Sequence, residues 1–158
     1  MYKVISLGAG VQSSTLFLMS CLGEIDRPDV AIFADTGAEP SQVYEHLEYL
    51  KGIGKEYCIP LEVVSIGNLG KDYYDLIDGK RTRVAAIPFF VKNGDGSQGM
   101  MRRQCTMDYK IVPLRRRAKE LMIESGNKEM ETWIGISVDE IDRMSISQAV
   151  DTRHICVY

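Results

Sequence analysis

Long apolar runs are absent from this 158-residue chain, and it carries only four cysteines and five prolines. A membrane-spanning helix needs about 20 consecutive apolar residues, and no stretch approaches that length. The opening MYKVISLGAGVQSS contains one lysine and a short apolar stretch that Gly8 and Gly10 interrupt, unlike a secretory signal. We therefore expect a cytoplasmic protein that neither spans nor contacts a membrane.

The four cysteines also lack the spacing of a metal site. They stand far apart, and no CxxC or CxxH pair occurs. Structural zinc and iron–sulfur sites depend on such closely spaced ligands. We expect no zinc, no iron–sulfur cluster and reduced thiols. The last of the cysteines, Cys156, follows His154 in a final apolar segment that we do not interpret as a site.

What the chain does contain is an ordinary globular composition, 45% apolar and 26% charged, with a net charge of −3. The net acidity argues against a protein that coats nucleic acid over its whole surface. Cations nevertheless cluster, because seven of them lie between residues 102 and 119 against the single acid Asp108. A second group comprises Lys80, Arg81 and Arg83. The clusters indicate either an anion-binding site or a solvated helix face.

Apolar runs alternate with amphipathic stretches along most of the chain. The runs predict strands at residues 3–7, 29–34, 61–66 and 132–138, and the amphipathic stretches predict helices at 12–22, 40–52 and 111–126. Such alternation is typical of an α/β fold with a mostly parallel, twisted sheet and helices on both faces, a Rossmann-like three-layer sandwich. We expect one domain over residues 1–158, with an irregular excursion at 67–105 and a shortened C-terminal portion.

The segment Ser6–Thr15 joins the first strand to the first helix and is rich in glycine and serine. Small residues let a ligand approach the backbone, and free N–H groups at a helix start attract anions. A tight turn with a serine cap is the alternative. The Walker pattern fails because no lysine follows the glycines. The dinucleotide pattern matches Gly8 and Gly10, and Asp35 stands where a ribose-binding acid would, so an NAD-type oxidoreductase remains open.

Four short motifs in order resemble one family. GAGVQSS (8–14) is similar to the pyrophosphate-binding loop SGGxDS, and FADTG (33–37) to the motif of the second strand that follows it. CTMDYKIVPLRR (105–116) resembles the segment CT..yK..P, and GISVDEIDR (135–143) the late motif G-I-x-x-D-E-x-x-R. Together they resemble the PP-loop superfamily of adenine nucleotide alpha hydrolase-like proteins, in particular its phosphoadenylylsulfate (PAPS) reductase-like members.

The resemblance implies a site for ATP or PAPS, with Mg²⁺ as an optional companion of the phosphates. The residues that it places around the phosphates are Gly8, Ala9, Gly10, Gln12, Ser13 and Ser14. Those that would line the adenosine pocket are Leu7, Ala34, Asp35 and Thr36. Those that would face the phosphate or sulfate end are Thr106 and Gly135, together with the candidate catalytic residues Lys110, Asp139 and Arg143.

Two departures from the family pattern bear on activity. Gln12 replaces the aspartate of SGGxDS, which removes a negative charge from the loop. The C-terminal cysteine motif of PAPS reductases is absent, so we do not expect sulfonucleotide reduction. The resemblance favours a transferase or nucleotide α-hydrolase that acts at the phosphates, with a non-catalytic nucleotide-binding module as the alternative. The acceptor, including a nucleic acid, and a homodimer or partner subunit stay open.

Overall fold

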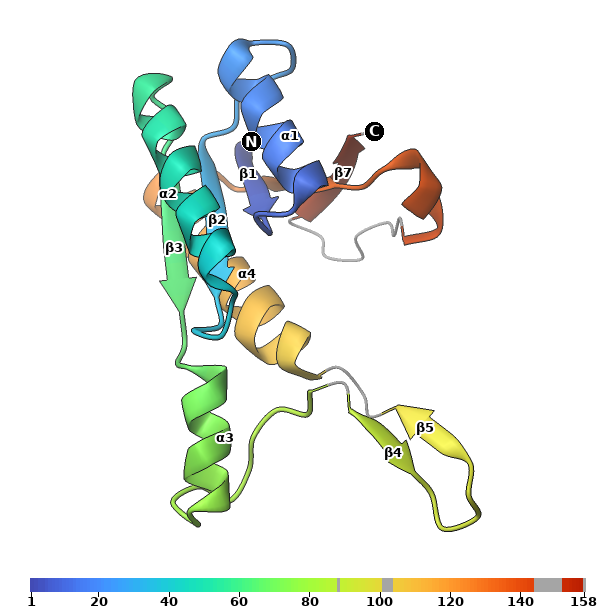
Figure 1. The fold of residues 1–158 in the computed structure, drawn as a ribbon. Coiled ribbons are helices and arrows are strands. Elements are labelled where there is room, and N and C mark those ends of the chain that lie inside the picture. Colours follow the sequence, from blue (N-terminus) through green and yellow to red (C-terminus); the bar gives the residue numbers. More distant parts are fainter. Residues whose placement is uncertain (88, 101–103, 144–151, 158) are drawn as a thin grey trace.

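The computed structural model describes residues 1–87, 89–100, 104–143 and 152–157, of which 141–143 and 152–157 are described by their backbone alone (Figure 1). Its main sheet is parallel throughout, with the strand order β3-β2-β1-β6-β7. The strands are β1 (Tyr2–Leu7), β2 (Val30–Asp35), β3 (Leu61–Ser65), β6 (Met130–Gly135) and β7 (Thr152–Val157). The α/β prediction with a parallel sheet is confirmed. β7, which the sequence analysis left as an apolar tail, pairs with β6.

Two apolar clusters lie on opposite faces of the sheet, because successive side chains of a strand alternate between its faces. On one face Ile5 packs with residues of α1 (Val11–Leu22) and α2 (Ser41–Glu56). On the other face Val4 packs with residues of α4 (Val112–Glu124). α1 and α2 thus pack on one face of β1 and β2, and α4 packs on the other.

The segment 67–105 is more regular than the expected irregular excursion. It contains the helix α3 (Leu69–Ile77) and a hairpin of β4 (Phe90–Lys92) and β5 (Gln98–Met100). The side chain of Asn68 caps α3 by accepting a hydrogen bond from the Lys71 N–H at 2.8 Å. In Figure 1 both elements extend below the sheet, away from its two apolar clusters. The excursion is therefore a structured projection.

The helix predicted at 111–126 has an unexpected beginning. Residues Thr106–Ile111 form a π-helix, η1, which continues directly into α4. A π-helix places one more residue in each turn than an α-helix does, and such segments are rare. Beyond β6, a 3₁₀ segment, η2 (Val138–Arg143), carries the acidic motif. β6 itself begins at Met130, two residues before the predicted start, because Tyr2 of β1 pairs with Met130.

Candidate functional site

The glycine loop turns sharply between β1 and α1. Ala9 adopts a positive φ of 54°, and Gly10 precedes the helix without a side-chain cap. The Ser13 hydroxyl accepts a hydrogen bond from the Gly8 N–H at 3.1 Å and lies 3.3 Å from the Gly10 carbonyl, to which it donates. Ser13, expected at the phosphates, thus braces the loop from inside. Ser14, also buried, lies 2.9 Å from Nε2 of His46 on α2, a contact that no motif announced.

The start of α1 presents free backbone donors. Among the described residues, no acceptor receives the N–H groups of Gly10, Val11 or Gln12. Gly135 at the end of β6 lets this turn come close, since a Cβ there would lie 2.6 Å from the Gln12 carbonyl carbon. β1 lies between β2 and β6, which is the point where the strand order reverses and where open α/β sheets bind ligands. The donors therefore lie at the expected ligand-binding edge.

A cavity of about 290 Å³ opens beside this loop at the carboxyl ends of β1, β2 and β6. The predicted residues Leu7, Gly8, Ala34 and Lys110 line it. Its other lining residues were not predicted, and they come from the same strands and from the η1–α4 junction: Ser6, Phe33, Ile111, Leu114, Arg115, Thr132 and Ile134. Most of the lining is apolar, and the two cations come from one helical segment.

Lys110 is held at this cavity by an acid that the motifs did not single out. Its ammonium group lies 2.7 Å from Oε1 of Glu39, on the loop after β2. The same Glu39 oxygen accepts a hydrogen bond from the Thr36 hydroxyl at 3.1 Å. The predicted residues Thr36 and Lys110 are thus joined through Glu39. Thr106, at the exposed start of η1, is not among the residues that line the cavity.

Asp35 braces the turn after β2. One oxygen of its carboxylate accepts hydrogen bonds from the Gly37 N–H at 2.8 Å and from the Tyr44 hydroxyl at 2.9 Å. Burial, and secondly the hydrogen bond to Asp35, raise the pKa of Tyr44. This oxygen is committed to the protein, which leaves the other carboxylate oxygen of Asp35 for a ligand.

Gln12 links the loop to η2 on the other side. Its amide nitrogen lies 3.3 Å from both the Ser137 hydroxyl and a carboxylate oxygen of Glu140, to which it donates. Asp139 is exposed, and a hydrogen bond from Ser137 lowers the pKa of its carboxyl group. The side chain of Arg143 lies outside the described residues. The position that bears an aspartate in SGGxDS therefore carries a neutral bridge.

A buried polar group fixes the π-helix. Tyr109 of η1 donates a hydrogen bond to the carboxylate of Asp72 on α3, and Arg81 pairs with the same carboxylate at 3.0 Å. Burial, together with the bond to Asp72, raises the pKa of Tyr109 to about 12. Neither Asp72 nor Arg81 belongs to a motif, so no sequence pattern indicated that they would meet Tyr109. The bond ties the segment that carries Lys110 to α3.

Much of the basic clustering is neutralised locally. Arg117 pairs with Glu62 of β3 at 2.8 Å, and Arg116 with Glu120 at 3.1 Å. Lys80 pairs with Asp78 in the same way, at 2.9 Å. Arg102 and Arg103 lie outside the described residues. Arg115 and Lys110 are the members of the cluster that line the cavity.

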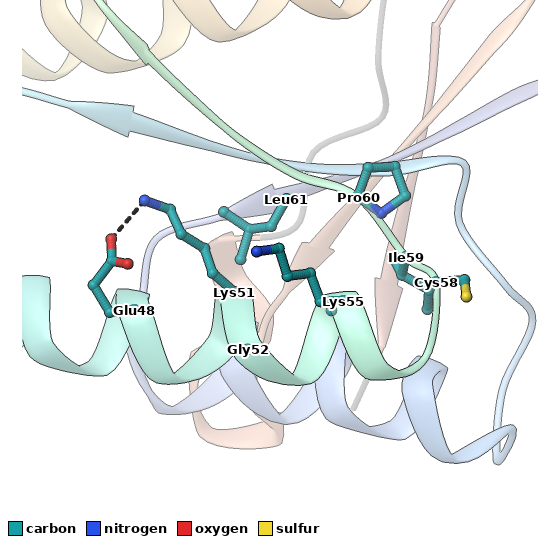
Figure 2. A pocket seen from close by; sticks show the side chains of 9 residues that line it. Glu48, Lys51, Gly52, Lys55, Cys58, Ile59, Pro60 and Leu61 are labelled. Carbon is teal, nitrogen blue, oxygen red and sulfur yellow. Dashed lines mark hydrogen bonds and ion pairs between the residues drawn. The ribbon is translucent and has the colours of Figure 1, made fainter.

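A second, larger hollow of about 660 Å³ lies at the opposite edge of the sheet, at the amino end of β3. Figure 2 shows Lys51 and Lys55 of α2 reaching past the start of β3, with Cys58 at the end of the groove. Lys51 pairs with Glu48 at 2.6 Å. The hollow is lined by lysines and apolar residues, whereas the smaller cavity is lined by Gly8 of the loop that precedes α1.

No family model and no curated protein matches this chain. Within the described ranges, no three histidine, cysteine, aspartate or glutamate side chains come close enough to hold a metal ion. Nor does any helix of those ranges have the length and apolarity to cross a membrane. The interpretation of the site therefore rests on its own geometry.

Proposed function

We propose that this chain is an adenine-nucleotide-binding PP-loop protein with the three-layer fold of the PAPS reductase-like family. It acts at the phosphates of ATP or of a sulfated adenine nucleotide. The observation that carries the proposal is that one loop joins two features at the reversal of the strand order: its Gly8 lines the cavity, and its Gly10, Val11 and Gln12 present free N–H groups. Backbone donors at a helix start favour phosphate, and an apolar cavity beside them suits a base.

The cavity is too small for a whole nucleotide, so we place the nucleoside inside it and the phosphates outside, along the glycine loop. At about 290 Å³ it lies at the lower end of the range for small-molecule sites, roughly 300–1,000 Å³. The nucleoside would lie against Leu7, Phe33 and Ala34, and the phosphates would extend along the glycine loop. Lys110 would turn from Glu39 toward the phosphates, and Arg115 would add a second positive charge at the rim.

The chemistry that suits such a site is substitution at the α-phosphorus. An acceptor atom forms a bond to phosphorus, the bond to the bridging oxygen breaks, and pyrophosphate leaves with the electron pair. Transfer of a sulfur-bearing group is the counterpart for a sulfated nucleotide. The chain would contribute positioning and charge neutralisation, through the loop N–H groups and Lys110. Because no three potential ligand side chains gather within the described ranges, we route no step through a metal ion.

One observation favours a non-catalytic nucleotide-binding module as the second candidate. The amide of Gln12 replaces a carboxylate and is committed to Ser137 and Glu140. A loop without this charge binds phosphate through N–H groups as before, but it offers no anionic group to organise a metal with the pyrophosphate. Binding without turnover is the outcome that separates this candidate from the first.

Titration calorimetry with ATP, PAPS, AMP and NAD at matched salt tests the ligand. We expect an adenine nucleotide to bind best and Lys110→Met or Arg115→Met to weaken it at least about tenfold, or about 1.4 kcal/mol. Lys55→Met, in the distant groove, is the matched control and should leave the affinity unchanged. Unchanged affinity in both site variants would overturn the placement. A preference for NAD that is lost in Asp35→Ala would contradict the proposed assignment to the PAPS reductase-like family.

Pyrophosphate release, measured with ATP and a panel of acceptors, tests turnover. Release that falls with nucleotide affinity in Lys110→Met supports the enzyme. Tight binding with no release for any acceptor supports the non-catalytic module.

A further inference from the structure

Residues 69–100 form a projection, called the arm below. In the arm a charged side chain is buried and large apolar side chains are exposed, the opposite of the usual distribution. In α3 the buried side chain is the charged Asp72, whereas Tyr74 and Ile77 are 72% and 78% exposed. In the hairpin Phe90 is 80% exposed. Monomeric proteins rarely leave large apolar side chains grouped at the surface. The arm therefore presents apolar surface that the rest of the described chain does not cover.

Polar contacts at its root, and few apolar ones, hold the arm. The Leu69 N–H donates to the Thr36 carbonyl at 2.8 Å, and Asp72 pairs with Tyr109. Within the described ranges, neither α3 nor the hairpin packs broadly on the sheet or on another helix. A two-stranded hairpin is marginally stable by itself in water. Packing against another surface would supply the stability that the monomer does not.

The arm carries both a groove and a projection. A groove of about 380 Å³ runs along α3, and its wall includes Tyr73 and Phe89, whose rings meet edge to face at 6.3 Å. The other lining residues are Ala38, Leu69, Gly70, Tyr74, Ile77 and Ile87. Phe90, next to the wall, is exposed and lies outside this lining. An aromatic side chain from a neighbouring molecule is the kind of group that such a groove accepts.

The charge of the arm indicates which neighbour it suits. Five cations are balanced by four acids in residues 69–100. Two of the cations are paired internally, Lys80 with Asp78 and Arg81 with Asp72. A nucleic acid would be favoured by a clear excess of positive charge, which the arm lacks. Two identical surfaces of nearly zero net charge meet without repulsion.

The free edge of the main sheet is a less suitable contact. Lys51 and Lys55 of α2 point toward β3, the edge strand (Figure 2), and charged side chains beside an edge strand disfavour its pairing with another chain.

We propose that the arm is a self-association surface and that two copies pair through it about a twofold axis. Phe90 of each copy enters the groove along α3 of the other, so the same contact forms twice. The inference does not depend on nucleotide binding. It does bring the second copy close to the candidate site, because the groove residue Ala38 adjoins Glu39, the acid that holds Lys110.

Sedimentation equilibrium and light scattering on the full chain test the proposal over a range of protein concentrations. We expect a dimer of twice 17.8 kDa that dissociates on dilution. Phe90→Glu and Ile77→Glu should each raise the dimer dissociation constant at least about tenfold. Ile123→Glu, at a position 62% exposed on α4, is the matched control and should leave the constant unchanged. Far-ultraviolet circular dichroism checks that each variant is folded.

A chain that stays monomeric at about 100 µM would overturn the proposal, since specific interfaces of ordinary size form below that concentration. So would a dimer that Phe90→Glu and Ile123→Glu weaken equally. A monomer that binds a labelled single-stranded oligonucleotide, with loss of binding in Phe90→Glu, would assign the arm to nucleic acid instead. Hydrogen exchange gives an independent check, because dimerisation should protect amides in residues 69–100 and not those of α4.

Discussion

Two regions of the molecule differ in which side chains they bury: the sheet with its three packed helices, and the arm. In the first region most buried side chains are apolar, such as Ile5 of β1 and Phe17 of α1, and Glu131 of β6 is a buried carboxylate among them. In the arm, the buried side chain of α3 is the carboxylate Asp72, whereas Tyr74 and Phe90 are largely exposed. The first region is stable through its own core. The second is ordered by a few polar contacts at its root and presents its apolar surface to other molecules.

This contrast separates two roles of apolar residues in one chain. Burial of apolar area drives folding at about 25 cal/mol per Å², but only where the area leaves water within the same molecule. Phe17 contributes in this way and Phe90 does not. Two residues of the same type therefore have different consequences, and substituting them tests the comparison most directly.

The largest effect is expected for Phe17→Ala. Phe17 is fully buried between α1 and the sheet, so its loss should lower the free energy of unfolding by about 3–5 kcal/mol. Phe90→Ala, the matched control in the arm, should change it by less than about 0.5 kcal/mol. Urea denaturation followed by circular dichroism at low protein concentration measures both. Equal losses would show that the arm shares the core, and the contrast would fail.

A smaller loss is expected where the sheet meets the glycine loop. In Gly135→Ala the new Cβ would lie 2.6 Å from the Gln12 carbonyl carbon, so the start of α1 must shift. We expect a loss of about 1–3 kcal/mol, as for overpacked interiors, and weaker nucleotide binding because the N–H donors move. Gly10→Ala is the control for stability, since nothing lies within 4 Å of its added methyl group. Denaturation and calorimetry on the two variants check this, and equal stability would contradict the close approach.

The smallest effect concerns the contact that joins the two regions. Tyr109→Phe removes the hydrogen bond to Asp72 and should cost about 1–2 kcal/mol at neutral pH. The native pKa of about 12 exceeds the ordinary 10, so the unfolded chain loses this proton first. The bond's contribution to stability therefore falls as the pH rises from 10 to 12.

Urea midpoints measured across that pH range should decline more steeply in the wild type than in Tyr109→Phe. Tyr74→Phe, an exposed tyrosine of the same arm, should keep the wild-type slope. If the urea midpoint declined equally with pH in all three proteins, the Asp72–Tyr109 bond would not be the contact that links the arm to the sheet.

Sequence patterns predicted those elements whose structure follows from the residues within the element itself. Apolar runs predicted β1, β2 and β3 within a residue or two. The reason is clearest for β2, which is buried on both faces and is apolar as far as Asp35. The family resemblance, and not the apolar runs, supplied the predicted cavity residues Leu7, Gly8, Ala34 and Lys110.

The missed features depend on partners that are distant in the chain. β7 exists through its pairing with β6, and Glu39 meets Lys110 across 71 positions of sequence. Asp72 is buried because Tyr109 and Arg81 satisfy it, which no periodicity of α3 could indicate. Tertiary packing decides which groups become hydrogen-bond partners here, so the pattern of residues along one segment does not predict them.

The π-helix at Thr106–Ile111 determines how the residues before α4 are oriented around the helix axis. Each residue of an α-helix advances the chain by about 100° around the axis, so deleting one residue here would straighten the turn and rotate everything before it by that angle relative to α4. Tyr109 and Lys110 could not then keep both Asp72 and the cavity as neighbours. The wide turn thus sets the rotation of the chain so that one continuous helical segment contacts both the arm, through Tyr109, and the cavity at the sheet edge, through Lys110.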